Sequence, residues 1–199
     1  MSITQTSSFT RFLLFFMLSA TLTQSSEIKK KADASPINVN RVGMQFPTYT
    51  FSNLAKQKKK IPDELKGDFK LMIVAFQRDQ QALVDTWFPI ADKLEEIYKE
   101  PGKKFNYYEI PTIYKMGFIR RALLNAGMRT GVREQAARER TFTIYIDKDP
   151  FKQILHIPHE NDIYLFLLDG NGKIIWRCQG KHSNENEKSL VQYLEKLNA

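Results

Sequence analysis

The chain has 199 residues, of which 42% are hydrophobic and 26% are charged, and its formal net charge is +8 at neutral pH. This composition excludes an intrinsically disordered chain, and the length is enough for one domain with a sizeable core. The single cysteine, Cys178, excludes an internal disulfide framework. The excess of basic residues predicts an anionic partner, either a protein or a membrane surface. Zinc-finger, KH and RRM signatures do not occur in the sequence, so we expect no nucleic-acid partner.

Residues 1–25 predict a signal peptide or a membrane anchor. They contain one basic residue, Arg11, and no acid, and residues 12–22 form an apolar run that is too short to span a bilayer. We expect cleavage near Ser26 and export to the periplasm or the outside of the cell, which lowers the net charge from +8 to +7. The segment is also rich in Ser and Thr, so a mitochondrial transit peptide and a place at the inner membrane are the alternative.

Residues 26–42 predict a flexible basic linker, and residues 43–199 predict a single folded domain. Within the domain, apolar residues alternate or recur at helical spacing in separate segments. The predicted elements are, in chain order, a strand or hairpin arm at 46–54, a solvated basic loop at 56–60, a buried strand at 69–76, a long helix from Gln81 to 100, a strand at 105–110, a helix at 114–128, a strand at 142–146, a turn at 147–150, a segment at 151–157 that pairs back, a strand at 163–168, a tight turn at 169–172, a strand at 173–178 and a closing helix capped by Asn184. This order predicts an α/β fold with a mixed sheet flanked by helices.

The helix at 114–128 combines apolar residues with a cluster of arginines. Its predicted apolar face comprises Met116, Ile119, Leu123 and Leu124. Arg120 and Arg121 are expected on its polar side, and Arg129 and Arg133 follow its C-terminal end. Arginine is the preferred residue for bidentate binding of carboxylate or phosphate groups. We therefore hypothesise that these four arginines form a docking face for an acidic protein partner or an anionic membrane surface.

Residues 43–197 resemble the thioredoxin-like superfamily. The segment GMQFPTYTFSNL is similar to the lead-in of redoxins, LMIVAF to the strand before the active site, and IYLFLLDGNGKIIWRCQG to the closing hairpin. Pro89 stands where thioredoxins kink the long helix. Within the superfamily, VAFQRDQQALVDTWFP, FIRRALLNAGMR and YLFLLDGNGKIIWRCQG resemble the mitochondrial ATP synthase assembly factor known as ATPase complex subunit ten. The resemblance implies a thioredoxin-like domain and a chaperone-like assembly role toward a hydrophobic membrane subunit.

The turn after the buried strand lacks the residues of a redox site. A dithiol oxidoreductase needs a nucleophilic thiol at the helix N-terminus and a second thiol to resolve the mixed disulfide. The turn here consists of Gln77, Arg78, Asp79, Gln80 and Gln81. Ile163 stands where the superfamily usually has a cis-proline. We therefore expect a redox-inactive protein that acts by binding or assembly. We expect no small-molecule cofactor, and the sequence favours a non-enzymatic role over an enzymatic one.

Two further features keep an enzymatic alternative open. Cys178 lies on a predicted strand, where a free cysteine usually behaves as a small buried hydrophobe. His156 and His159, in HIPHEND, are residue types that bind metals, although a polar loop explains them better. The alternative function is thus a one-thiol redox enzyme that uses Cys178, or a metal-dependent enzyme that uses the two histidines.

Overall fold

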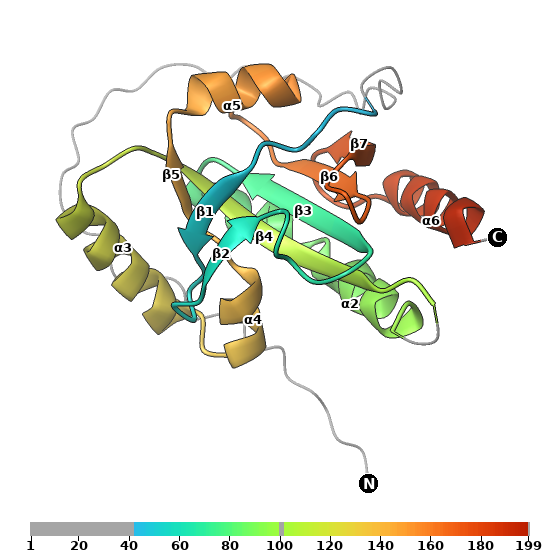
Figure 1. Cartoon of the computed structure of the whole chain (residues 1–199), viewed down its shortest axis with the longest axis horizontal. Helices are drawn as coiled ribbons and strands as arrows, with labels where there is room; N and C mark the ends of the chain where they lie inside the picture. Colours follow the sequence, from blue (N-terminus) through green and yellow to red (C-terminus); the bar gives the residue numbers. More distant parts are fainter. Residues whose placement is uncertain (1–41, 100–101, 199) are drawn as a thin grey trace, which may run out of the picture.

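A five-stranded mixed sheet organises residues 42–99 and 102–198, which the computed structural model describes (Figure 1). The strands lie in the order β5 (Ile144–Ile146), β4 (Phe105–Tyr114), β3 (Phe69–Ala75), β6 (Tyr164–Leu168) and β7 (Ile174–Gln179). Strand β4 runs parallel to β3 and β5, whereas β6 runs antiparallel to β3 and β7. The predicted signal peptide and the predicted linker up to residue 41 lie outside the described residues.

The central strand β3 is apolar except for Lys70, because both of its faces are covered. Leu71 and Ile73 point into one hydrophobic cluster, and Met72 and Val74 point into the other. These four side chains are at most 1% exposed. The predicted two-face burial of this strand, and of β6, is therefore confirmed.

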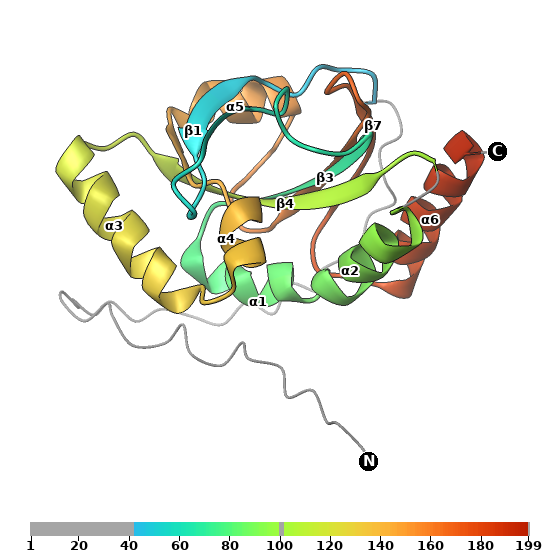
Figure 2. The same cartoon turned by 60° about the horizontal axis from the view of Figure 1, so that its bottom comes forward.

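Helices cover one face of the sheet, and a hairpin with one helix covers the other (Figure 2). The first layer consists of α1 (Gln81–Asp85), α2 (Phe88–Ile97) and α6 (Asn184–Asn198). The second layer consists of the antiparallel strands β1 (Tyr49–Ser52) and β2 (Lys58–Ile61) and of α5 (Lys148–Leu155). No helix among the described residues is long and apolar enough to cross a membrane.

The long helix predicted from Gln81 is broken into α1 and α2. Pro89 lies in the first turn of α2. Proline has no N–H for a helical hydrogen bond, but its fixed φ suits the start of a helix. The chain therefore ends α1 at Asp85 and starts a new helix at Phe88, rather than kinking one continuous helix.

Two predictions of secondary structure near the hairpin layer were wrong. The segment at 151–157 does not pair back as a strand, because α5 begins at Lys148 and buries Phe151 and Leu155 on one side. The carboxylate of Asp147 caps this helix by accepting from the backbone N–H of Asp149 at 3.2 Å. The predicted basic loop at 56–60 contains most of strand β2, whose pairing with β1 is favoured by the full burial of Ile61.

The arginine-rich segment also differs from its prediction. Helix α3 (Phe118–Gly131) starts four residues later than expected, because Tyr114 still belongs to β4. A further short helix, α4 (Gln135–Arg140), follows it and was not predicted. Ile119 and Leu123, which we expected on a buried apolar face, are 80% and 74% exposed. Met116 and Leu124 of the predicted apolar face are half-buried. The part of that face formed by Ile119 and Leu123 thus points outward.

Candidate functional site

The turn after β3 is held closed by one buried glutamine. The turn forms a 3-10 helix, η2 (Arg78–Gln80), and Gln80 is 4% exposed. The Gln80 Oε1 atom accepts from the backbone N–H groups of Phe76 at 2.8 Å and Gln77 at 3.2 Å. Its Nε2 donates to the backbone oxygen of Glu160 at 2.7 Å, and the Nε2 of Gln77 donates to the same oxygen at 3.0 Å. The two glutamines therefore tie the turn to the loop that precedes β6.

The side chain of Glu160 extends this connection to α5. One carboxylate oxygen lies 2.5 Å from Nζ of Lys148, and the other lies 2.9 Å from Nζ of Lys152. Lys148 is buried, and its Nζ lies 4.1 Å from the ring centroid of Tyr114. Burial acts to raise the pKa of Glu160, but the hydrogen bonds from the two lysines outweigh it and hold the pKa below its ordinary value.

The turn therefore has polar amides where redox chemistry would need thiols. Gln77 and Gln80 have the spacing of the two cysteines in a C-x-x-C motif. Arg78 and Asp79 between them are exposed. Ile163 is fully buried directly before β6, and the cis peptide bond found in the described part of the chain is at Ile61–Pro62 instead. Amide groups neither attack a disulfide nor transfer electrons, so the glutamines of this turn supply no thiol for disulfide exchange.

A second polar cluster, which the sequence did not reveal, surrounds Glu109 on β4. Its carboxylate accepts from Thr141 Oγ1 at 3.3 Å and from Gln81 Nε2 at 3.4 Å. Burial, together with the nearby carboxylate of Asp85, raises the pKa of Glu109 to about 7, although the hydrogen bonds from Gln81 and Thr141 and the charge of Arg140 act to lower it. A single acid within an apolar strand was the only signal in the sequence, and its partners are distant along the chain.

The raised pKa of Glu109 predicts a pH dependence of stability. The unfolded carboxyl has its ordinary pKa of 4.5, so the folded state binds more protons between about pH 4.5 and 7. Wild-type stability should fall as the pH rises through this window and then level off. Glu109→Gln, which mimics the protonated acid, should unfold with a free energy about 1–2 kcal/mol above wild type at pH 8 and close to it at pH 5.

Chemical denaturation at several pH values measures this difference. Glu96→Gln, at an exposed carboxylate of α2, is the matched control and should follow the wild-type curve. Parallel curves for wild type and Glu109→Gln would show that this carboxyl is ionised in the folded state at all the pH values tested.

The remaining candidate residues lie on β7, at the end of α5 and in the loop before β6. Cys178 is 6% exposed on β7, and burial raises the pKa of its thiol well above the ordinary value. His156 ends α5 in a left-handed conformation, with φ of 49°. His159 Nδ1 lies 3.2 Å from the hydroxyl of Tyr164. Within the described ranges, no three His, Cys, Asp or Glu side chains come together as a metal site.

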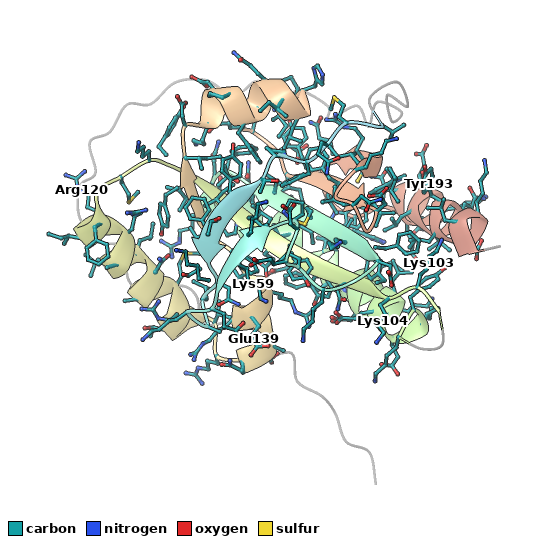
Figure 3. The ribbon with its side chains drawn as sticks, in the orientation of Figure 1. Lys59, Lys103, Lys104, Arg120, Glu139 and Tyr193 are labelled. Atoms are coloured by element: carbon teal, nitrogen blue, oxygen red, sulfur yellow. The ribbon has the colours of Figure 1, made fainter. Side chains whose placement is uncertain are left out.

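The four arginines of the predicted docking face divide into two kinds. Arg120 and Arg133 are exposed, and Figure 3 shows Arg120 pointing away from the body at the outer end of α3. Arg121 and Arg129 are half-buried. The guanidinium of Arg121 lies 5.9 Å from the ring centroid of Tyr145, so part of its role is to hold α3 against the sheet.

Comparison with known proteins decides the family. The model of the ATP10 protein family matches residues 30–197, which is most of the chain. The chain belongs to the ATP10 protein family. This membership confirms the resemblance to the ATP synthase assembly factor that the sequence suggested, and it fits an assembly role. Because that factor is mitochondrial, the match supports the inner-membrane alternative and gives no support to export. No curated protein sequence matches this ATP10 family member.

Solved structures show the fold of the ATP10 family member. BsSco, described as a member of the Sco family of cytochrome c oxidase assembly proteins, is 10% identical with a TM-score of 0.50, covering 77% of this chain and 93% of its own. A putative protein disulfide isomerase from Bacteroides thetaiotaomicron is 18% identical with a TM-score of 0.49, covering 79% and 90%. A putative DsbE from Chlorobium tepidum is 14% identical with a TM-score of 0.47, covering 79% and 98%. The fold is thioredoxin-like, as predicted.

Proposed function

We propose that this ATP10 family member is a redox-inactive, chaperone-like assembly factor that works by binding a protein partner. The observation that carries the proposal is the turn at 77–80, where glutamines stand at the spacing of two thiols. The amide of Gln80 makes three hydrogen bonds there, so the turn is a closed structural unit. We infer that a thioredoxin-like domain with such a turn acts by binding a partner through its surface.

The proposed site of action is the mitochondrial inner membrane, and the proposed contact surface includes three arginines of α3 and Arg133, which follows the helix. Family membership supports the location, and the net charge of +8 supports an anionic partner or surface. Of the four arginines, Arg120 and Arg133 are exposed and thus able to contact a partner directly. Arg121 and Arg129 add to the positive potential of the same helix, although both are half-buried.

Cys178→Ala is expected to leave the assembly of ATP synthase unchanged. The thiol is buried on β7 and its pKa is raised, so very little of the nucleophilic thiolate forms. The variant is produced in cells that lack their own copy of the gene, and the assembled enzyme is measured on native gels. Rescue should equal that of the wild-type chain, whereas cells with an empty vector should show the assembly defect.

The same assay tests the enzymatic alternatives. A Cys178→Ala chain that accumulates to the wild-type level but does not restore assembly would support a one-thiol redox enzyme. His156→Ala combined with His159→Ala should also restore assembly, because the described residues do not gather these histidines into a metal site. If no ATP synthase defect follows removal of the gene, the assembly function itself is wrong.

A further inference from the structure

Helix α3 presents its apolar side chains to the outside of the molecule. Phe118, Ile119 and Leu123 are 76%, 80% and 74% exposed, and Tyr114 just before the helix is 53% exposed. No residue of α3 is buried. Figures 1 and 2 show α3 at one end of the molecule, with α6 at the other end. Exposed apolar side chains that lie next to one another usually mark an interaction surface.

The outward orientation of these side chains is fixed by polar contacts on the inner side of α3. The Tyr145 hydroxyl donates to Oδ1 of Asn125 at 2.7 Å, and the guanidinium of Arg121 lies over the same ring. One turn further along, the Thr143 hydroxyl lies 3.5 Å from the sulfur of Met128. Because Arg121, Asn125 and Met128 are turned toward the sheet, the helix cannot also bury Ile119 and Leu123 there. These two apolar side chains therefore remain exposed on the outside of the domain.

The charge around this helix restricts what that surface can be. Residues 110–133 contain five Lys and Arg residues and neither Asp nor Glu. Lys115 and Arg120, both exposed, line the same open hollow as Phe118 and Ile119 at the N-terminal end of α3. Gly117, the N-cap residue, provides no side-chain acceptor for the first N–H groups, so the helix dipole adds positive charge at this end.

We propose that the outer side of α3 lies in the interface of an anionic phospholipid membrane, an inference that rests on the membrane location given under the proposed function. An acidic peptide would satisfy Lys115 and Arg120 but would leave Phe118, Ile119 and Leu123 in water. An apolar protein helix would cover those three residues but would desolvate the cations. A bilayer interface offers acyl chains and phosphate groups within about 5–10 Å of each other, and so satisfies both groups.

The test places a reporter on α3 in the purified full chain. Phe118→Trp is mixed with phosphatidylcholine vesicles that contain brominated acyl chains, with or without phosphatidylglycerol. Trp87 and Trp176 are 0% and 4% exposed, so their emission provides a constant background. The added tryptophan should shift to the blue and be quenched on the anionic vesicles. Ile154→Trp, at an exposed apolar position on α5, should remain unquenched on the same vesicles.

Charge variants separate the local cations from the net charge. In the Phe118→Trp background, Lys115→Ala with Arg120→Ala should weaken partitioning roughly 25-fold, because each cation near an anionic surface contributes roughly fivefold. Lys188→Ala with Lys196→Ala on α6 removes the same charge and should leave partitioning unchanged. An equal loss in both double variants would overturn the assignment to α3.

The remaining outcomes are also decisive. Absence of quenching in Phe118→Trp, or equal quenching in Ile154→Trp, would exclude insertion of α3. A shift of emission that needs a partner protein instead of vesicles would assign this surface to a protein. The vesicle assay contains no ATP synthase, so its result does not depend on the assembly function. A negative vesicle result would not contradict the assembly role tested with Cys178→Ala. Failure of the assembly test would likewise not contradict binding of α3 to vesicles.

Discussion

Replacing Gln80 with alanine is expected to lower the free energy of unfolding by about 3 kcal/mol. The change removes three hydrogen bonds and leaves the backbone N–H groups of Phe76 and Gln77 without their acceptor. Leaving a buried polar group unpaired costs about 1–3 kcal/mol, more than the net gain from an average hydrogen bond. Denaturant titration followed by far-ultraviolet circular dichroism measures the effect.

Gln77→Ala is the matched control for this change. Gln77 is exposed, and its side chain donates to the same oxygen of Glu160, so its loss should cost less than about 1 kcal/mol. If the two variants have the same stability, water replaces the amide of Gln80 at no net cost. The turn would then be held by its backbone alone. The hydrogen bonds of Gln80 would no longer support the proposal that this turn is a closed structural unit.

Glu160→Gln is expected to cost about 2–3 kcal/mol at pH 7. It removes the negative charge between Lys148 and Lys152, and the Lys148 side chain is only 7% exposed. Losing one partner of a buried ion pair leaves the other charge uncompensated, which costs about 3–5 kcal/mol when burial is complete. The ring of Tyr114 still stabilises the charge of Lys148 in the variant. The expected loss of unfolding free energy is therefore smaller than for a completely buried pair.

The pH dependence of this cost follows from the lowered pKa of Glu160. A carboxylate whose pKa is lowered by folding stabilises the protein fully above its unfolded pKa, and that stabilisation is lost as the pH falls through the folded value. The difference between wild type and Glu160→Gln should therefore shrink in acid. Asp149→Asn is the control, because the Asp149 side chain is 67% exposed and its pair with Lys152 should contribute less than about 0.5 kcal/mol. Equal losses in both variants would show that Glu160 is solvated.

The sheet could be predicted because its signals are local. A continuous apolar run marked β3, and the turn at 169–172 between two apolar segments marked β6 and β7. The sequence does not predict α5 because its two buried apolar residues, Phe151 and Leu155, are too few to distinguish helical from strand periodicity. The capping side chain of Asp147 is the available signal in the sequence, but Asp-Lys-Asp-Pro at 147–150 is equally typical of a turn.

The candidate site depends on contacts between distant residues, which the spacing of apolar residues in the sequence does not predict. Gln80 and Glu160 are 80 residues apart in the sequence, and their hydrogen bond follows from the fold, not from either segment alone. Similarly, the spacing of Ile119 and Leu123 predicts one apolar side of a helix, but it does not say whether that side faces the sheet. The inner contacts of α3 with Tyr145 decide the orientation.

The lysines of β2 have a consequence for self-association. Among the described residues, β2 pairs with β1 alone. On its other edge, Glu64 accepts from the Lys60 N–H at 2.9 Å and donates its own N–H to the Lys60 carbonyl at 2.7 Å, so only the part of this edge near Lys58 is left for a strand from another molecule. Lys58, Lys59 and Lys60 follow one another in this strand, and a second copy added antiparallel at that edge would bring like charges together. The same three residues that looked like a solvated loop thus discourage edge-to-edge aggregation of the hairpin, while leaving the molecule free to bind through α3.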